Sequence, residues 1–169
     1  MMLIDNKGKK AGILSSKHYP FQASYTKQWR NMAVFSLGSN IPKAHKHSIM
    51  ILESLFMWLK AHSRLHICAT SPIWRNPPFG FKMQNDFYNA IMICQSDMGL
   101  REIYRLMFYA ERRFGRGRKR AFKNAPRTLD IDLIYFNTLR VNLSHLQIPH
   151  KHYKERPSVM LPLSFMECF

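Results

Sequence analysis

The stretch PRTLDIDLIYF, residues 126–136, alternates acidic and apolar side chains in a way that is typical of a β-strand with one buried face. In a strand over residues 129–136, Asp130 and Asp132 stand two positions apart and share one face, while their apolar neighbours point into a core. Two carboxylates on one face repel each other unless a cation or hydrogen bonds lie between them. Oxygen ligands at this spacing suit Mg²⁺, which completes its coordination with water and substrate phosphates. The stretch therefore predicts a core strand that carries a metal site.

The residues that precede this strand are strongly basic. The segment GRGRKRAFKNAP, residues 115–126, follows two further arginines, and Arg127 adjoins the aspartates. An isolated D-x-D pair is more often a solvated strand face, and an isolated basic segment is more often a nucleic-acid patch. The chain has only ten acidic residues, however, and two of them lie beside its densest run of cations, which favours a site for a metal and a bound anion. The sequence G-x-x-x-x-G-K does not occur, which excludes a P-loop.

The remaining patterns alternate between strand and helix. Pro42 suits the first turn of a helix, and Gly115 is suited to stop one. The order β-α-β-β-α-β is the split βαβ or ferredoxin-like arrangement, an α/β (α+β) fold whose mainly antiparallel sheet carries its helices on one face. We expect strands at residues 32–37, 65–74, 87–94 and 129–136, helices at 42–62 and 100–114, and a short strand at 139–142 that pairs with the strand before it.

Length and composition predict one basic domain with an extension. The chain has 169 residues, of which 46% are hydrophobic, so it can build a core, and this excludes a disordered basic tail. Its net charge is 26 − 10 = +16, which points to an anionic partner and excludes an acidic solvating protein. Residues 1–31 are rich in lysine and show no lasting period, so we expect an N-terminal extension there and the functional domain at residues 32–169.

The cysteines and the apolar runs indicate a cytoplasmic setting. Three widely spaced cysteines form no C-x-x-C pair, which excludes a zinc ribbon or redox motif and makes a reducing compartment the default. No apolar run reaches the length of a signal peptide or of a membrane span, so we expect neither.

A nucleic-acid-binding module is the rival interpretation. The RNA-recognition motif has the same β-α-β-β-α-β order, and Phe79-Gly80-Phe81 faintly resembles its aromatic signature. Pro77-Pro78 places those aromatics in a loop, however, and the strand FYNAIMIC, residues 87–94, lacks the basic and aromatic alternation that base stacking needs. The patterns therefore favour a phosphate-handling enzyme over this module.

Six short motifs, in order along residues 32–163, resemble the 6-hydroxymethyl-7,8-dihydropterin pyrophosphokinases of folate synthesis. The most specific is PRTLDIDL, residues 126–133. The resemblance implies a ferredoxin-like fold and the transfer of a diphosphoryl group from MgATP to the pterin hydroxymethyl group, with release of AMP. The other motifs are SLGSN (36–40), PPFG (77–80), DFYNA (86–90), E-x-x-x-G-R-x-R (Glu111 to Arg118), and PH (149–150) with the later Arg156 and PL (162–163).

The resemblance also implies a site for two Mg²⁺ ions and for ATP. Asp130 and Asp132 match the family's metal ligands. From the residues alone, Glu111 is equally well explained as an exposed acid on a helix, and His150 as a histidine in a loop. The positions that match the arginines around the triphosphate and the catalytic loop are Arg116, Arg118 and Arg127, and those that match the nucleotide site are Glu111, Arg127, His150 and Arg156.

A pterin pocket is implied in the same way. An asparagine such as Asn89 in an apolar strand needs buried hydrogen-bond partners, which favours a ligand role over a core role. Phe79 and Phe87 are as consistent with the core as with a ligand site. Ser158 stands where the family usually has a phenylalanine that stacks on the pterin, so Phe122, Phe79 or Phe87 would have to stack instead. The matching positions are Gly38, Asn76, Pro77, Phe79, Phe87 and Asn89.

These implications complete the expected function. ATP and 6-hydroxymethyl-7,8-dihydropterin are the expected partners, and we expect no nucleic acid and no membrane. We expect a monomer. The basic segment at residues 115–126 is a candidate lid over the phosphates.

Overall fold

A computed structural model describes residues 2–4, 10–26, 28–77, 84–115 and 126–166. Their fold is a mixed α/β arrangement around a mainly antiparallel sheet, as predicted. The strands run in the order β1-β2-β6-β7-β4-β8, and β5 pairs with β7 and with β3. The long strands and the helices between them are β4 (Asn31–Ser39), α1 (Ser48–Lys60), β5 (Leu65–Thr70), β6 (Ile73–Asn76), β7 (Phe87–Ser96), α2 (Leu100–Arg113) and β8 (Asp130–Phe136).

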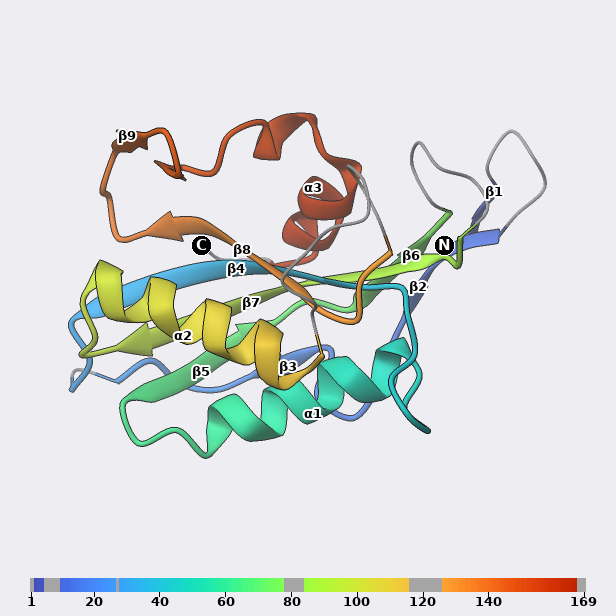
Figure 1. The fold of residues 1–169 in the computed structure, drawn as a ribbon, viewed down its shortest axis with the longest axis horizontal. Coiled ribbons are helices and arrows are strands. Elements are labelled where there is room, and N and C mark those ends of the chain that lie inside the picture. Colours follow the sequence, from blue (N-terminus) through green and yellow to red (C-terminus); the bar gives the residue numbers. More distant parts are fainter. Residues whose placement is uncertain (1, 5–9, 27, 78–83, 116–125, 167–169) are drawn as a thin grey trace.

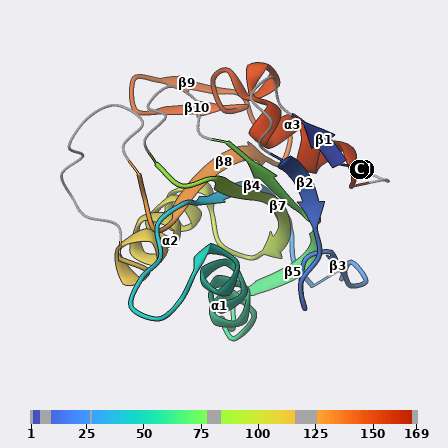
Figure 2. The ribbon, with the colours of Figure 1, turned by 90° about the vertical axis from the view of Figure 1, so that its right-hand side faces the viewer.

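Helices cover both faces of the sheet. In Figures 1 and 2, α1 and α2 lie on one side and α3 (Pro157–Ser164) lies on the other. The central strand β7 explains this, because Ala90, Met92 and Cys94 join the core under α1 and α2, whereas Ile91 and Ile93 pack with residues of α3 on the opposite face. The prediction that the helices share one face therefore holds for α1 and α2 and is wrong for α3.

Two predicted element bounds are wrong for local reasons. Helix α1 begins at Ser48 and not at Pro42, because residues 43 and 46 close a turn through reciprocal backbone hydrogen bonds of 2.9 Å. The expected strand at residues 65–74 is two strands, β5 and β6. Pro72 has no N–H to continue the ladder, and the Ser71 hydroxyl instead accepts the N–H of Ile91 (2.9 Å).

The chain after β8 also departs from the prediction. Asn137 adopts a left-handed conformation (φ 49°), and its N–H donates to the Met32 carbonyl (2.8 Å). The next strand, β9 (Val141–Leu143), pairs with β10 (Leu146–Ile148) and not with β8. This hairpin leads to the short 3₁₀ helix η1 (Tyr153–Glu155) and then to α3.

The residues before β4 extend the sheet. Strand β2 (Lys10–Leu14) pairs with β1 (Met2–Ile4) and with β6, and β3 (Phe21–Gln22) pairs with β5. Between them, Tyr19 is fully buried and its hydroxyl donates to the Leu52 carbonyl of α1 (3.1 Å). These strands share the sheet of the main domain. The division into an extension at residues 1–31 and a functional domain stays a prediction.

Helix α2 ends as predicted. Gly115 follows it at φ 97°, a left-handed conformation that glycine adopts without steric cost. Within the described ranges no helix is long and apolar enough to cross a membrane.

Candidate active site

The two aspartates of β8 lie on the sheet face that α3 partly covers. Ile131 and Leu133, which alternate with them, belong to the core under α1 and α2. The predicted division of β8 into an acidic face and a buried apolar face is therefore confirmed. The side chains of Asp130 and Asp132 keep 21% and 30% of their surface exposed, so both carboxylates are reachable from solvent.

Three cationic or titratable side chains surround these carboxylates. Arg127 donates from Nη1 to Asp130 Oδ2 (2.6 Å), and Arg156 donates from Nη1 to Asp132 Oδ2 (3.0 Å). His150 Nε2 lies 3.7 Å from Asp132 Oδ1. Arg127 precedes β8, His150 follows β10 and Arg156 precedes α3, so the fold brings together three segments that are separate in the sequence.

The environment of Asp132 works against its ionisation. Burial raises the pKa of its carboxyl above the ordinary 3.8, and the neighbouring charge of Asp130 acts in the same direction. The charges of His150, Arg156 and Arg127 lower this pKa, but they do not outweigh the other two effects. The site thus holds unfavourable negative charge that a bound cation would relieve.

The donor groups fit Mg²⁺ bound together with phosphates. No group of three or more His, Cys, Asp or Glu side chains gathers as a metal cage in the described part of the chain. Two carboxylates are what Mg²⁺ commonly uses when substrate phosphates supply other ligands. Among the described atoms, Arg127 Nε and His150 Nδ1 are buried without a hydrogen-bond partner. Two unpaired nitrogens beside the carboxylates suit a site that is completed by an anion.

A line of residues crosses the sheet from Asp130 to the opposite end of this face. Trp74 pairs with Asn89, Asn89 with Gly38, and Gly38 with Asp130, on β6, β7, β4 and β8 respectively. We call these four residues the cross-strand row. At Gly38 a Cβ atom would lie 3.1 Å from Asn89 Oδ1 and 3.8 Å from Asp130 Cβ, so glycine keeps the space between the amide and the carboxylate open.

The far end of the cross-strand row is neutral. Asn89, 7% exposed, donates from Nδ2 to Asn76 Oδ1 (2.6 Å), and Asn76 donates from Nδ2 to the carbonyl of Pro77 (2.9 Å). Phe87 stands directly opposite Asn76 in the ladder of β6 and β7. Four of the residues expected to contact a pterin therefore lie together.

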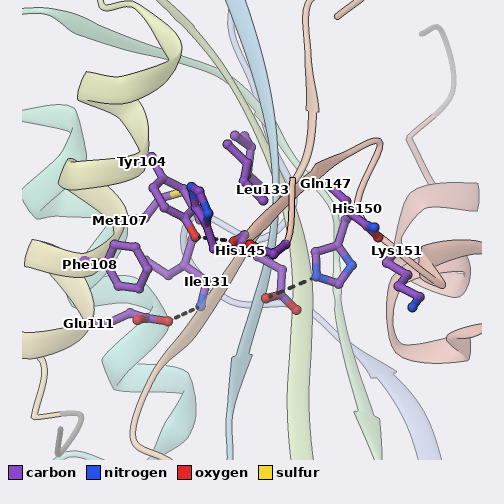
Figure 3. Close-up of a pocket in the computed structure, with 13 residues that line it drawn as sticks. Tyr104, Met107, Phe108, Glu111, Ile131, Leu133, His145, Gln147, His150 and Lys151 are labelled. Carbon is purple, nitrogen blue, oxygen red and sulfur yellow. Dashed lines mark hydrogen bonds and ion pairs between the residues drawn. The ribbon is translucent and has the colours of Figure 1, made fainter. Parts of the chain in front are cut away.

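A pocket of about 380 Å³ opens at the other end, beyond Asp132. Figure 3 shows Tyr104 and Phe108 of α2 on one side of it, with Tyr104 joined to His145 by a hydrogen bond, and His150 on the other side. Its lining comes from α2, from β8, and from the β9–β10 hairpin with the turn that follows. The lining residues are Tyr104, Met107, Phe108, Glu111, Ile131, Asp132, Leu133, Ser144, His145, Leu146, Gln147, His150 and Lys151.

Glu111 joins this pocket to the aspartate strand. It is 3% exposed, so the interpretation as an ordinary exposed acid is wrong. Its Oε1 accepts the N–H of Ile131 (2.9 Å), the residue between the two aspartates, as the dashed line in Figure 3 marks. Because β8 is the last strand of the sheet, this N–H has no further strand to pair with, and the carboxylate satisfies it.

The sequence pointed to some of these residues and missed others. Tyr104 and Phe108 were missed, although Phe108 is 44% exposed and an exposed aromatic on an amphipathic helix is a usable signal. Ser158, half-buried, lies in the first turn of α3. Arg116, Arg118, Phe79 and Phe122 lie outside the described residues.

Comparisons with known proteins show the family to which the chain belongs. The model of the family described as 7,8-dihydro-6-hydroxymethylpterin-pyrophosphokinase matches residues 34–167. The chain is 43% identical over 155 residues to the 2-amino-4-hydroxy-6-hydroxymethyldihydropteridine pyrophosphokinase of Helicobacter pylori, covering 92% of this chain and 93% of the relative. The chain is 40% identical to the protein of the same name from Campylobacter jejuni, over 89% of this chain and 92% of the relative. A folic acid synthesis protein of Dictyostelium discoideum is 31% identical over 79% of this chain and 19% of its own length.

Proposed function

Because this chain belongs to the 6-hydroxymethyl-7,8-dihydropterin pyrophosphokinase family, we propose that it holds ATP and the pterin at opposite ends of the cross-strand row. The enzyme transfers a pyrophosphoryl group from ATP to hydroxymethyldihydropterin in folate biosynthesis. One observation carries the proposed placement: a single face of the sheet has a paired amide at one end and a paired carboxylate beside a pocket at the other.

The transfer itself is a displacement at phosphorus. The hydroxymethyl oxygen of the pterin forms a bond to the β-phosphorus of ATP, and the bond from that phosphorus to the bridging oxygen of the α-phosphate breaks. The electron pair of the broken bond stays on the bridging oxygen, so AMP, which contains the α-phosphate, is the leaving group. The hydroxyl proton goes to solvent. Such a reaction depends on positioning and charge neutralisation more than on covalent chemistry by the protein.

The nucleotide end of this arrangement is the pocket between α2 and the β9–β10 hairpin. The apolar and aromatic part of its lining, on α2 and β8, suits a purine ring, and Phe108 offers an exposed aromatic surface. Asp132 borders the pocket, so a nucleotide bound there would direct its phosphates along β8 towards Asp130. His150 and Arg156 stand beside Asp132, where they would bind phosphate oxygens.

Asp130 and Asp132 would hold two Mg²⁺ ions. The family uses MgATP, and the count of two ions is our proposal. Bound Mg²⁺ would neutralise phosphate charge and favour ionisation of the pterin hydroxyl. Arg127 would stabilise charge on the transferred group from its position beside Asp130, and we propose the same role for Arg116 and Arg118.

Neutral groups would orient the pterin at the other end. The Asn89–Asn76 pair offers amide donors and acceptors to the edge of a pterin ring, which carries both. Gly38 leaves room between this pair and Asp130, so the hydroxymethyl arm would lie over Gly38. We propose that Phe87 stacks on the ring in place of an aromatic side chain at Ser158.

We further propose that the enzyme acts as a monomer in the cytoplasm. Both ends of the cross-strand row and the pocket belong to one chain. Cys68 and Cys94 are buried free thiols, which is consistent with a reducing compartment.

A product assay tests the proposed function. Incubation with ATP, Mg²⁺ and 6-hydroxymethyl-7,8-dihydropterin should release AMP and pterin diphosphate in equal amounts, and neither should form when the pterin or the metal is omitted. Release of ADP, or AMP formation that does not depend on the pterin, would contradict this function.

A further inference from the structure

Asn40 is a buried polar residue that the proposed reaction does not use. It follows β4 directly and lies two positions after Gly38 of the cross-strand row. Only 1% of its surface is exposed. Burying an amide is costly unless its donors and acceptors are paired, so its partners show what the fold uses it for.

One side of the Asn40 amide holds the start of the aspartate strand. Its Oδ1 accepts the N–H of Arg127 (2.8 Å), and its backbone N–H donates to the Arg127 carbonyl (3.1 Å). These reciprocal bonds fix the backbone of the residue whose guanidinium binds Asp130 (2.6 Å). Asn40 therefore holds the phosphate end of the site through Arg127.

The other side of the same amide holds the segment that leads into the pterin end. Its Nδ2 donates to Gln84 Oε1 (2.9 Å) and lies 3.4 Å from the Asn85 carbonyl. The next residue, Asp86, accepts from Arg75 Nε (2.9 Å) and Nη2 (2.8 Å), which ties this segment to β6 beside Asn76. Asn40 therefore touches the frame of the pterin site as well.

We propose that Asn40 is a positioning residue that couples the two substrate sites, so that occupation of one strengthens binding at the other. One planar amide contacts both frames, so a shift of Arg127 towards bound phosphates changes the position from which Nδ2 donates to Gln84. This proposal rests on the proposed placement of ATP and pterin. The coupling it describes is reciprocal, because each ligand must change the other's affinity by the same factor.

The chain offers a matched control at the opposite end of β4. Asn31 also bridges two segments with its amide, donating from Nδ2 to the Met98 carbonyl (3.0 Å) and accepting from Asn137 Nδ2 (2.8 Å). Both of its partners lie outside the proposed substrate sites. Asn31→Ala thus removes a similar structural link without touching the proposed coupling.

The coupling factor is the dissociation constant of a non-hydrolysable ATP analogue without the pterin divided by that with saturating pterin, each measured with Mg²⁺ by calorimetry. In the unchanged enzyme we expect a factor of about 5 or more, falling by at least about threefold in Asn40→Ala and staying the same in Asn31→Ala. Gln84→Ala, which leaves the buried amide in place, should also lower the factor, and Gln84→Glu should restore it by keeping the oxygen acceptor.

The outcomes separate the inference from the proposed function. A factor near one in the unchanged enzyme, or a factor that Asn40→Ala and Gln84→Ala leave unchanged, would overturn the inference while the binding of each ligand alone still supports the two sites. If Asn40→Ala does not fold, the two Gln84 variants decide the result. Failure of the unchanged enzyme to bind either ligand would instead contradict the proposed placement of substrates.

Discussion

The two ends of the cross-strand row share one sheet face but differ in their chemistry. At the β8 end, two partly buried carboxylates stand among Arg127, His150 and Arg156. At the β6 and β7 end, Asn76 and Asn89 bind each other through neutral amides. A charged end that keeps unfavourable negative charge suits metal and phosphate, whereas a neutral end suits an uncharged heterocycle. The difference predicts that variants at the two ends will affect different kinetic constants.

The largest effect should follow removal of a carboxylate at the charged end. We expect Asp130→Ala and Asp132→Ala each to lower kcat by about 10³-fold or more, because the metal and the phosphates lose a ligand and a fixed charge. The fold should survive, since both side chains are partly exposed. Steady-state AMP release measures kcat, and circular dichroism checks the fold.

Asp97→Ala is the matched control for these variants. Asp97 also pairs with an arginine, Arg64 (2.8 Å), but lies at the exposed turn before α2. Its removal should leave kcat unchanged. A normal kcat in either β8 variant would refute the assignment of the charged end.

A smaller effect should follow removal of the amide at the neutral end. Asn89→Ala leaves Asn76 Oδ1 without the donor from Asn89 and takes donors away from the pterin, which should weaken pterin binding by about 1–3 kcal/mol. We expect the KM for the pterin to rise by about 10–100-fold, with the KM for ATP unchanged. A rise in both constants, measured by varying each substrate, would break the proposed division between the ends.

A change in the nucleotide pocket should have a milder effect, on the KM for ATP and not on the KM for the pterin. Phe108→Ala should raise the KM for ATP by about fivefold through the loss of an aromatic contact, and leave the KM for the pterin alone. Tyr109→Ala is its control, because Tyr109 is similarly exposed on α2, but its ring centroid lies 5.9 Å from that of Trp58 and it does not line the pocket. Equal effects of the two substitutions on the KM for ATP would argue against the pocket.

The smallest effect concerns the stability of the metal-free protein. Burial and the charge of Asp130 raise the pKa of Asp132 above 3.8. The folded protein therefore binds this proton more tightly than the unfolded chain does. The contribution of this proton to the free energy of unfolding is complete below pH 3.8 and is lost as the pH rises through the folded pKa. Asp132→Asn should raise the thermal midpoint at neutral pH, and the gain should shrink as the pH falls. Calorimetry with a chelator tests this, and a lower midpoint at neutral pH would contradict it.

The parts that sequence alone could predict are those with a local signal. The division of β8 between Asp130 and Asp132 on one face and Ile131 on the other follows from the period of a strand. The end of α2 at Gly115 follows from backbone conformation, since few other residues adopt φ 97°. The split of the expected 65–74 strand also had a local signal, because Pro72 has no N–H to continue the ladder, and the Ser71 hydroxyl accepts the N–H of Ile91 at that point.

The parts that the sequence could not predict depend on packing between distant segments. The pocket combines residues from 104 to 151, and the buried Glu111 accepts the N–H that Ile131 of the edge strand presents to it. The position of α3 depends on the second apolar face of β7, where Ile91 and Ile93 pack with α3. The apolar run of β7 alone does not show whether one face of the strand is covered or both. The cross-strand row likewise requires the register of four strands.

Counting the metal ions tests the central claim most directly. Mn²⁺ can be titrated into the enzyme with saturating pterin and a non-hydrolysable ATP analogue, and bound ions counted by electron paramagnetic resonance. We predict two ions per chain in the unchanged enzyme and in Asn89→Ala once both ligands are saturating, and at most one in Asp130→Asn and Asp132→Asn. Two ions bound in either aspartate variant would contradict the assignment of the charged end as the centre of pyrophosphoryl transfer.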